Sequence, residues 1–322
     1  MLRRAQHDTI RASRVSRCRA IPDGYVRGPL ACFQQCENHM NRKIILHIGS
    51  PKCGSTYLQQ MLLKNTAVLR AHDMLYPHDG GSHPGNAGAL DKITCATLES
   101  YFKGTTNTVI LSHEDLYSLA ATHGTPLVPL LDDMQIDVQL VAFLRPFSEF
   151  IYGDYSQFMK QYFPKFLAAR NPYDGRDFTA FVQRRIDTMK PAAFLRRWQA
   201  RFPQLPLALN SNRNIRATMT DLLGPELGEA LCWDVPQSQV NRSLRMTDCE
   251  EIASAMRDPA TPDNSIRAMF KEAVLNVAKP DSGKTPERSA WLEEQFAPQN
   301  LTLLKEFGFD NRLAPGLSQA AD

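Results

Sequence analysis

The sequence predicts an α/β fold in which a central, mainly parallel sheet is flanked by helices. Three short apolar runs rich in Ile, Val and Leu, 43–48, 108–111 and 137–144, have the composition of strands that are covered on both faces. A segment with helical spacing follows each run. With 322 residues, 43% of them hydrophobic, the chain is long enough for one sizeable domain of this kind.

Composition argues against several classes of protein. The net charge of +3 is mildly basic, which suits an anionic ligand but is too weak to indicate a nucleic-acid partner. No apolar run approaches the roughly 18 residues that a membrane span requires. Seven cysteines are scattered without CxxC pairs or metal-ligand spacing, so we expect reduced thiols, no bound metal and a cytoplasmic location.

The start of the chain differs from the rest. It contains many arginines, few acidic residues and no sustained hydrophobic period. A transit peptide is one interpretation of such a start, and an extension upstream of Met40 is the other. We expect residues 1–40 to be a disordered N-terminal extension, residues 41–312 to form the α/β domain and residues 313–322 to be a flexible tail.

The connection after the first apolar run predicts an anion-binding loop. Gly49 and Gly54 bracket a segment in which the backbone turns sharply and can approach a ligand closely. Ser55 and Thr56 then begin a helix, whose free N–H groups and positive dipole end favour an anion. An ordinary tight connection between a strand and a helix is the alternative.

The loop has the frame of a nucleoside-triphosphate loop but lacks one residue. Gly49-x-x-x-x-Gly54 should be followed by Lys and then Ser or Thr, whereas Ser55 follows directly. The lysine of the loop, Lys52, stands earlier and cannot serve a triphosphate and its magnesium in the usual way. The pattern therefore favours a phosphate ester that is handled without a metal.

The segment HIGSPKCGSTYLQ resembles the phosphosulfate-binding loop of the sulfotransferases, whose usual form is close to PK-[small]-GT-[ST]. Cys53 stands where a small residue is usual, and Ser55 replaces Thr with its hydroxyl retained. The resemblance implies a three-layer, P-loop-like fold and 3′-phosphoadenosine 5′-phosphosulfate (PAPS) as co-substrate. It implies a catalytic role for Lys52 at the bridging oxygen. The implied co-substrate-binding residues of the loop are Pro51, Lys52, Cys53, Gly54, Ser55, Thr56 and Tyr57.

The second apolar run ends in Ser112-His113-Glu114-Asp115. Ligands of an open parallel sheet bind at the carboxyl ends of the strands, and transfer to a hydroxyl needs a base. This segment resembles the SxE element of the same family, which makes Glu114 the first candidate for the base and His113 the second. The alternative is that Ser112, with Glu114 or Asp115, caps a helix that we expect from Leu116.

The third apolar run ends at Arg145-Pro146. The fork of donors of an arginine at a strand end suits a phosphate monoester. The segment resembles the family's element for the 3′-phosphate, in which a helical serine follows about eight positions after the arginine. Gly153 occupies that position, so we expect Ser156, one turn further, to supply the hydroxyl. A surface salt bridge is the alternative role for Arg145.

Other segments give weaker signals. His78 and His83 lie in a loop that either borders an acceptor cleft or is merely solvated. The segment 240–244 resembles the family's Asn-x-Ser segment before the last helices, and Thr247 has the sequence context of an N-cap. We expect helices over 191–201 and 215–223 and an edge strand over 205–209. The candidates for a cationic lid are Lys160, Lys165, Arg170 and Arg176.

Together these features predict an enzyme that transfers a sulfuryl group from PAPS to a hydroxyl or amine of an acceptor. Carbohydrate, lipid, peptide and small phenol all fit the sequence as acceptors. Two other functions are open. One is a non-catalytic protein that binds PAPS or its product PAP. The other is a P-loop kinase or nucleotide hydrolase, against which the missing lysine after Gly54 speaks.

Overall fold

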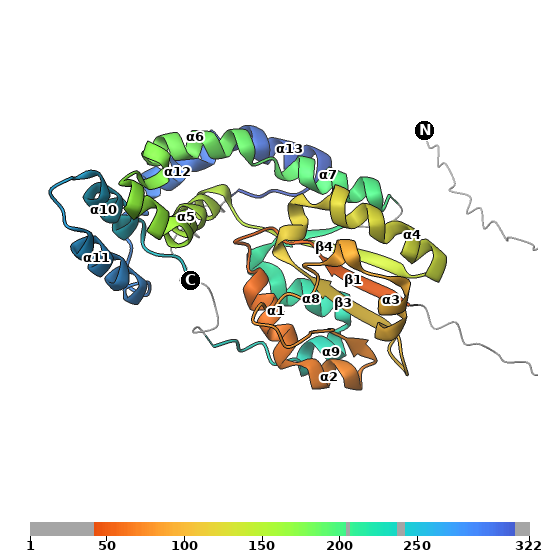
Figure 1. Cartoon of the computed structure of the whole chain (residues 1–322). Helices are drawn as coiled ribbons and strands as arrows, with labels where there is room; N and C mark the ends of the chain where they lie inside the picture. Colours follow the sequence, from red (N-terminus) through yellow and green to blue (C-terminus); the bar gives the residue numbers. More distant parts are fainter. Residues whose placement is uncertain (1–41, 204–206, 237–241, 313–322) are drawn as a thin grey trace, which may run out of the picture. The chain divides into compact units, whose positions relative to one another are not determined.

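A computed structural model describes residues 42–203, 207–236 and 242–312, all within one compact unit, His39–Asp322. In this part of the chain the fold is α/β, with a five-stranded sheet in the order β2-β3-β1-β4-β5 (Figure 1). All four strand pairs are parallel, as expected. The predictions for residues 1–40 and for 313–322 lie outside the described residues.

The three central strands are the three apolar runs. Every residue of β3 is buried, as are all but the first of β1 and most of β4. Helices cover both faces of the sheet, so these strands read as continuous rather than alternating apolar segments. The strands are β1 (Lys43–His47), β2 (Met74–Leu75), β3 (Thr108–Ser112), β4 (Asp137–Leu144) and β5 (Leu207–Ser211).

The edge strands were harder to place. Among the described residues, β5 pairs only with β4. It begins two residues later than the predicted edge strand over 205–209, part of which is outside the described residues. β2 is a two-residue strand beside β3 that the sequence did not predict. Both strands are only partly buried, so their apolar pattern is weak.

The helices form the outer layers and a larger helical part beyond the carboxyl ends of the strands. In Figure 1, α1, α2, α8 and α9 lie on one side of the sheet, and α4 and α7 lie on the other. The helices are α1 (Ser55–Lys64), α2 (Thr66–Ala71), α3 (Cys95–Tyr101), α4 (Thr125–Met134), α5 (Phe147–Ala169), α6 (Phe178–Thr188), α7 (Pro191–Arg201), α8 (Ile215–Leu223), α9 (Pro225–Ala230), α10 (Met246–Arg257), α11 (Asp263–Leu275), α12 (Pro286–Gln295) and α13 (Ala297–Phe307).

Two helix starts differ from the prediction. The chain after β3 first forms a 3-10 segment, Glu114–Ser118, and a π turn, and the α-helix α4 begins only at Thr125. Thr247 is not an N-cap, because α10 starts at Met246 and the carboxylate of Asp281 accepts the N–H groups of both residues. A carboxylate from a distant loop thus replaces a local cap. The helices expected over 191–201 and 215–223 are confirmed.

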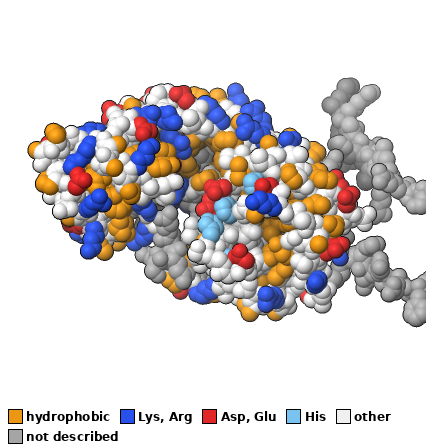
Figure 2. Space-filling view, in the orientation of Figure 1, with side chains coloured by type: hydrophobic (Ala, Val, Ile, Leu, Met, Phe, Trp, Pro, Cys, Tyr) orange, Lys and Arg blue, Asp and Glu red, His pale blue; other side chains and the backbone are white. Residues whose placement is uncertain are grey.

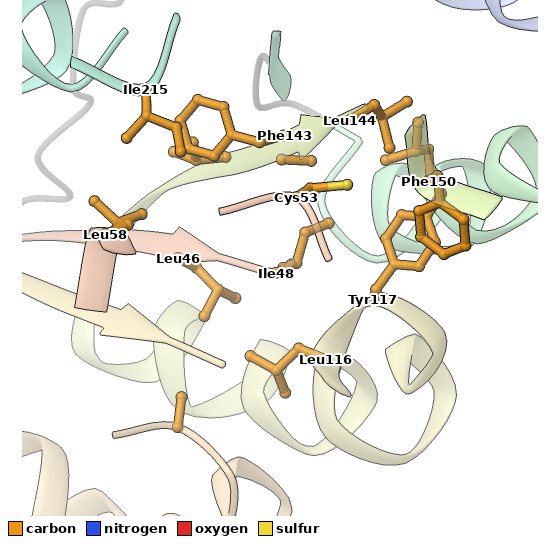
Figure 3. Packing of buried hydrophobic residues seen from close by; sticks show 14 of the residues in the cluster. Leu46, Ile48, Cys53, Leu58, Leu116, Tyr117, Phe143, Leu144, Phe150 and Ile215 are labelled. Atoms are coloured by element: carbon orange, nitrogen blue, oxygen red, sulfur yellow. The ribbon is translucent and has the colours of Figure 1, made fainter. Parts of the chain in front are cut away.

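The core packs directly beneath the loop that follows β1. Leu46 and Ile48 are buried on and after β1, and Leu58 is buried on α1. Figure 3 shows Phe143 and Ile215 on one side of this strand and Leu116 on the other. No helix of the described residues is long and apolar enough to cross a bilayer.

Candidate functional site

The loop after β1 lies against the segment that follows β3. Gly49 has a φ of 96°, and a Cβ at this position would stand 2.4 Å from the backbone oxygen of Glu114. Gly54 has a φ of 88°, and its Cβ would meet the Ile215 side chain at 2.5 Å. Only glycine satisfies both the left-handed conformation and these close approaches. The two bracketing glycines therefore hold the loop between the ends of the central strands and α8.

The first turn of α1 is open toward this loop. Gly54 is the N-cap residue, and within the described residues no side chain caps the helix. The hydroxyl of Ser55 donates to the backbone oxygen of Ser50 at 3.2 Å, which closes the loop on itself. The first N–H groups of a helix have no partner within the helix, so they suit an external anion.

Two side chains of the predicted loop set point away from such an anion. Tyr57 donates its hydroxyl to the backbone oxygen of Trp233 at 2.8 Å, so its side chain is directed toward the segment after α9. Cys53 is buried in the core, and burial raises its pKa to about 11. Both residues can serve an anion only through their backbone N–H groups.

Lys52 extends toward α5 rather than back over the loop. Its Nζ donates to the Gln157 side-chain oxygen at 2.8 Å. Burial lowers the pKa of Lys52, and the carboxylate of Asp154 opposes this shift. Asp154 is itself buried and lies 2.7 Å from the Nε of Arg185. Lys52 therefore sits in a partly buried charged cluster.

Arg145 lies beside Lys52, on the same side of the molecule. A Cβ at Gly153 would stand 3.9 Å from Arg145 Nη1 and 4.0 Å from Lys52 Cβ. The salt-bridge interpretation of Arg145 also holds in part, since its Nε lies 3.5 Å from the Glu149 carboxylate. The loop lysine and the strand-end arginine thus both lie next to Gly153.

The hydroxyl nearest to Gly153 is not that of Ser156. Ser156 is buried, and its Oγ accepts the N–H of Leu244 at 2.7 Å, so it ties α5 to the segment before α10. Ser243 Oγ instead lies 3.6 Å from the place of a Cβ at Gly153. Sequence reasoning missed this role of Ser243, because only the docking of a distant segment brings it beside Arg145.

A buried polar network lies at the end of β3. His47 and Ser112 are register partners on β1 and β3, and His47 Nδ1 lies 2.8 Å from Ser112 Oγ. Gln59 of α1 donates to Ser112 Oγ at 3.1 Å and to the Glu114 carboxylate at 3.3 Å. Ser112 therefore does not cap the next helix, and the side chain of His113 accepts the N–H of Asp115 instead.

The carboxylate of Glu114 is held by its neighbours in the ionised form. Burial by itself raises its pKa, but hydrogen bonds from its own backbone and Gln59, together with His83, bring the pKa below its usual value. His83 Nε2 lies 3.5 Å from Glu114, and its ring stacks on that of His113 at 4.6 Å. Burial lowers the pKa of His113. At neutral pH both candidate bases are therefore able to accept a proton.

The remaining candidates separate into near and distant residues. Lys160 donates to the backbone oxygen of Arg242, next to Ser243, and burial lowers its pKa. Arg170 pairs with Asp263, Arg176 pairs with Asp174, and Lys165 is exposed. His78 binds the backbone oxygen of His83 and orders that loop. Figure 2 shows histidine and acidic side chains gathered together on one face of the molecule.

Gln157 and Asp154 were not predicted as site residues. Both lie on α5: Gln157 is four positions after Gly153 and so shares its face of the helix, and Asp154 is the next residue after Gly153. The signal available in the sequence was that both residues follow shortly after Arg145, at the end of the third apolar run. Comparisons with known proteins found no matching family model, no matching curated protein and no matching solved structure.

Proposed function

We propose that this protein transfers a sulfuryl group from PAPS to a hydroxyl or amine of an acceptor. The observation that carries the proposal is that Lys52 and Arg145 both lie beside Gly153, and that no side chain of the described residues caps the first turn of α1. PAPS carries two separate anionic groups on one adenosine. A site with two cations and a helix N-terminus has the donors that both groups require.

Sulfuryl transfer needs a positive charge at the bridging oxygen and a base at the acceptor hydroxyl. A bond forms between the acceptor oxygen and sulfur, and the bond from sulfur to the bridging phosphate oxygen breaks, with its electron pair left on that oxygen. In this proposal Lys52 exchanges its hydrogen bond to Gln157 for the bridging oxygen and neutralises this charge. Losing one such donor costs on the order of 100–1000-fold in rate. Glu114 or His113 takes the acceptor proton. Arg145 and Ser243 hold the 3′-phosphate.

The charge of the cluster fits an anion in spite of one opposing group. Asp154 faces Lys52, and a carboxylate there disfavours a phosphate. Its partner Arg185 lies 2.7 Å away, and burial raises the pKa of Asp154. The pair of Asp154 and Arg185 is thus close to neutral, which reduces the repulsion between Asp154 and a bound anion.

The test compares transfer from labelled PAPS to a panel of acceptors by wild type, Lys52→Ala and Lys64→Ala. Lys64 is an exposed lysine in the last turn of α1, so it is the matched control. We expect Lys52→Ala to lose at least about 100-fold in rate and Lys64→Ala to be unchanged. Equal rates for Lys52→Ala and wild type would remove the mechanism.

Binding of PAP, followed by calorimetry, separates the alternatives. Tight PAP binding without turnover on any acceptor would favour a non-catalytic binding protein. Magnesium-dependent binding of ATP in preference to PAP would favour a kinase or nucleotide hydrolase. Loss of PAP binding in Arg145→Ala, with retention in Lys64→Ala, is the result that the proposal expects.

A further inference from the structure

Gln59 is a fully buried polar residue in the middle of α1. A buried side-chain amide is unfavourable unless its polar atoms find partners. The amide nitrogen of Gln59 uses both of its hydrogens, since it donates to Ser112 Oγ at 3.1 Å and to the Glu114 carboxylate at 3.3 Å. The opposite orientation of the amide would point its oxygen at a carboxylate, which also only accepts. Gln59 therefore faces Glu114 as a donor.

Ser112 anchors this amide to the sheet. It is the last residue of β3 and is fully buried. Its Oγ also lies 2.8 Å from Nδ1 of His47, its register partner on β1. One hydrogen of the Gln59 amide is thus bound to a strand end that is fixed within the sheet. The other hydrogen holds the carboxylate of Glu114, two residues further along the chain.

The loop that carries His83 closes over the amide. A Cβ at Gly85 would stand 2.9 Å from Gln59 Nε2. Asn86 ties this loop to β3, because its N–H donates to the backbone oxygen of Ser112 at 3.0 Å and its side chain accepts the Ser112 N–H at 2.8 Å. The hydrogen bonds of Gln59 are therefore shielded from water, and a bond to a charged group is stronger in such surroundings.

The same helix carries the end of the site that is proposed to bind the anion. Ser55 is the first residue of α1 and lies four positions before Gln59, so the two side chains are on one face of the helix. Both side chains are buried. Because one short helix links them, Gln59 sets the distance between the first turn of α1 and the Glu114 carboxylate. Transfer depends on that distance, since the base has to meet an acceptor that is aligned with the sulfuryl group.

Gln59 also affects the charge of Glu114. Burial by itself raises the pKa of Glu114, and the hydrogen bond from Gln59 is one of the contacts that lower it. Gln59 is uncharged, so its replacement by an apolar residue removes this bond and leaves the charged neighbours in place. The titratable side chains that interact with the carboxylate are His47, Lys52, Tyr76, His83 and His113.

We propose that Gln59 is a positioning residue that acts through Glu114. It holds the carboxylate at a fixed place relative to the first turn of α1 and in the form that accepts a proton. This role rests on the proposed function and takes Glu114 as the base, because Nδ1 of His113 already accepts the N–H of Asp115 at 3.3 Å. Gln59 itself touches neither PAPS nor the acceptor.

The first experiment compares Gln59→Met with wild type. Methionine keeps the length of the side chain and removes its donors. The rate is measured with labelled PAPS and the best acceptor of the panel, and PAP binding is measured by calorimetry. Gln60→Met is the matched control, since Gln60 is the next residue of α1, is only partly buried and donates neither hydrogen bond.

We expect Gln59→Met to lower kcat/KM about tenfold or more at neutral pH, because a hydrogen bond to a charged group is lost. The acid limb of its pH profile should move to higher pH, since the pKa of Glu114 rises without this bond. The affinity for PAP should be unchanged, and Gln60→Met should match wild type throughout. In the background of Glu114→Ala, Gln59→Met should have no further effect on the rate.

A second experiment examines the contact from the side of Glu114 and needs no change at Gln59. The side-chain amide of Gln59 is observed by NMR in the full chain, labelled with ¹⁵N-glutamine, in wild type and in Glu114→Ala. We expect its hydrogens to exchange slowly with water in wild type, and one of them to shift and exchange faster in Glu114→Ala. The amide of Gln60 should be the same in both proteins.

Three results would overturn the positioning role while leaving the proposed function in place. They are an acid limb that does not move in Gln59→Met, an equal loss of rate from Gln59→Met with and without Glu114, and a Gln59 amide that Glu114→Ala leaves unaffected. Absence of transfer from PAPS to any acceptor by wild type removes the proposed function and the catalytic part of the role together. The NMR comparison does not depend on transfer, so the two failures are distinguishable.

Discussion

The two ends of the candidate site are built in different ways. The carboxylate end, with His47, Ser112 and Glu114, lies on neighbouring strand ends, where sheet register brings its residues together. The cationic end unites Lys52, Arg145 and Ser243, which come from a loop, a strand end and the segment before α10. The first end depends on sheet register and on the neighbouring Gln59 of α1, whereas the second requires the helical part to dock onto the sheet. Substitutions at the two ends should therefore have different consequences.

The largest effect is expected at Gly49, where the loop after β1 touches the backbone of Glu114. Gly49→Ala places a Cβ 2.4 Å from the backbone oxygen of Glu114 in a left-handed conformation. We expect a loss of roughly 2–5 kcal/mol in the free energy of unfolding, from the backbone conformation and from overpacking. The measurement is denaturant unfolding, with PAP binding as a second readout.

Gly104→Ala is the matched control for this clash. Gly104 also has a positive φ, 68°, but its Cβ would meet nothing within 4 Å. It should cost only the conformational part, about 1–2 kcal/mol. If the two variants lose the same stability, the contact between the loop and the β3 segment does not constrain the fold.

The carboxylate end should make stability depend on pH. Burial lowers the pKa of His47 from 6.5 to about 4, so the unfolded state binds more protons between these two values. Stability should therefore be complete above about pH 6.5 and fall as the pH decreases toward 4, by on the order of 3 kcal/mol. Unfolding measured at several pH values checks this, and a profile no flatter in His47→Gln than in wild type would contradict it.

Removal of the Ser243 hydroxyl at the cationic end should weaken ligand binding without unfolding the protein. Ser243→Ala should weaken PAP binding about five- to tenfold, because a hydrogen bond to a charged group is lost. Ser254→Ala changes an exposed serine of α10 and is the control. Gly153→Ser in the Ser243→Ala background should restore part of the affinity, since the new side chain would stand beside Arg145. If Gly153→Ser in this background restores none of the affinity for PAP, the 3′-phosphate binds elsewhere.

The smallest effect is expected at the exposed histidine of the carboxylate end. His83 helps to lower the pKa of Glu114 from a distance of 3.5 Å, but its side chain is 49% exposed. Its replacement by Ala should raise the pKa of Glu114 only slightly, because solvent screens such a pair. The acid limb of kcat/KM should shift to higher pH. His72→Ala, an exposed control, should leave that limb in place.

The parts of the site that follow from one strand could be predicted, and those that depend on docking could not. The loop, the Arg145 strand end and the Glu114 segment each follow an apolar run, and parallel strands bring these ends to one edge. The choice of Ser156 as the hydroxyl beside Arg145 assumed that the face of α5 was enough to place it. In the structure Ser156 Oγ accepts the N–H of Leu244, and the hydroxyl nearest to Gly153 is that of Ser243.

The cap of α10 and the cavity lined by Pro51, Tyr117 and Phe194 were beyond the sequence for the same reason. Asp281 caps α10 from a loop far along the chain, so no local pattern around Thr247 could reveal it. The cavity gathers residues from the loop, the 3-10 segment, α5, α6 and α7, which are far apart in the sequence. Its shape exists only after these elements have packed.

By itself, the sequence of this protein determined the α/β class, the three central strands and the glycine-bracketed loop between β1 and α1. These features rest on periodicity and backbone geometry, which act over a few neighbouring residues. Only the tertiary structure decided which hydroxyl lies beside Gly153, how Glu114 is held and where the cavity next to the loop opens. Those features depend on contacts between segments far apart in the chain, and such contacts are set by how whole elements pack.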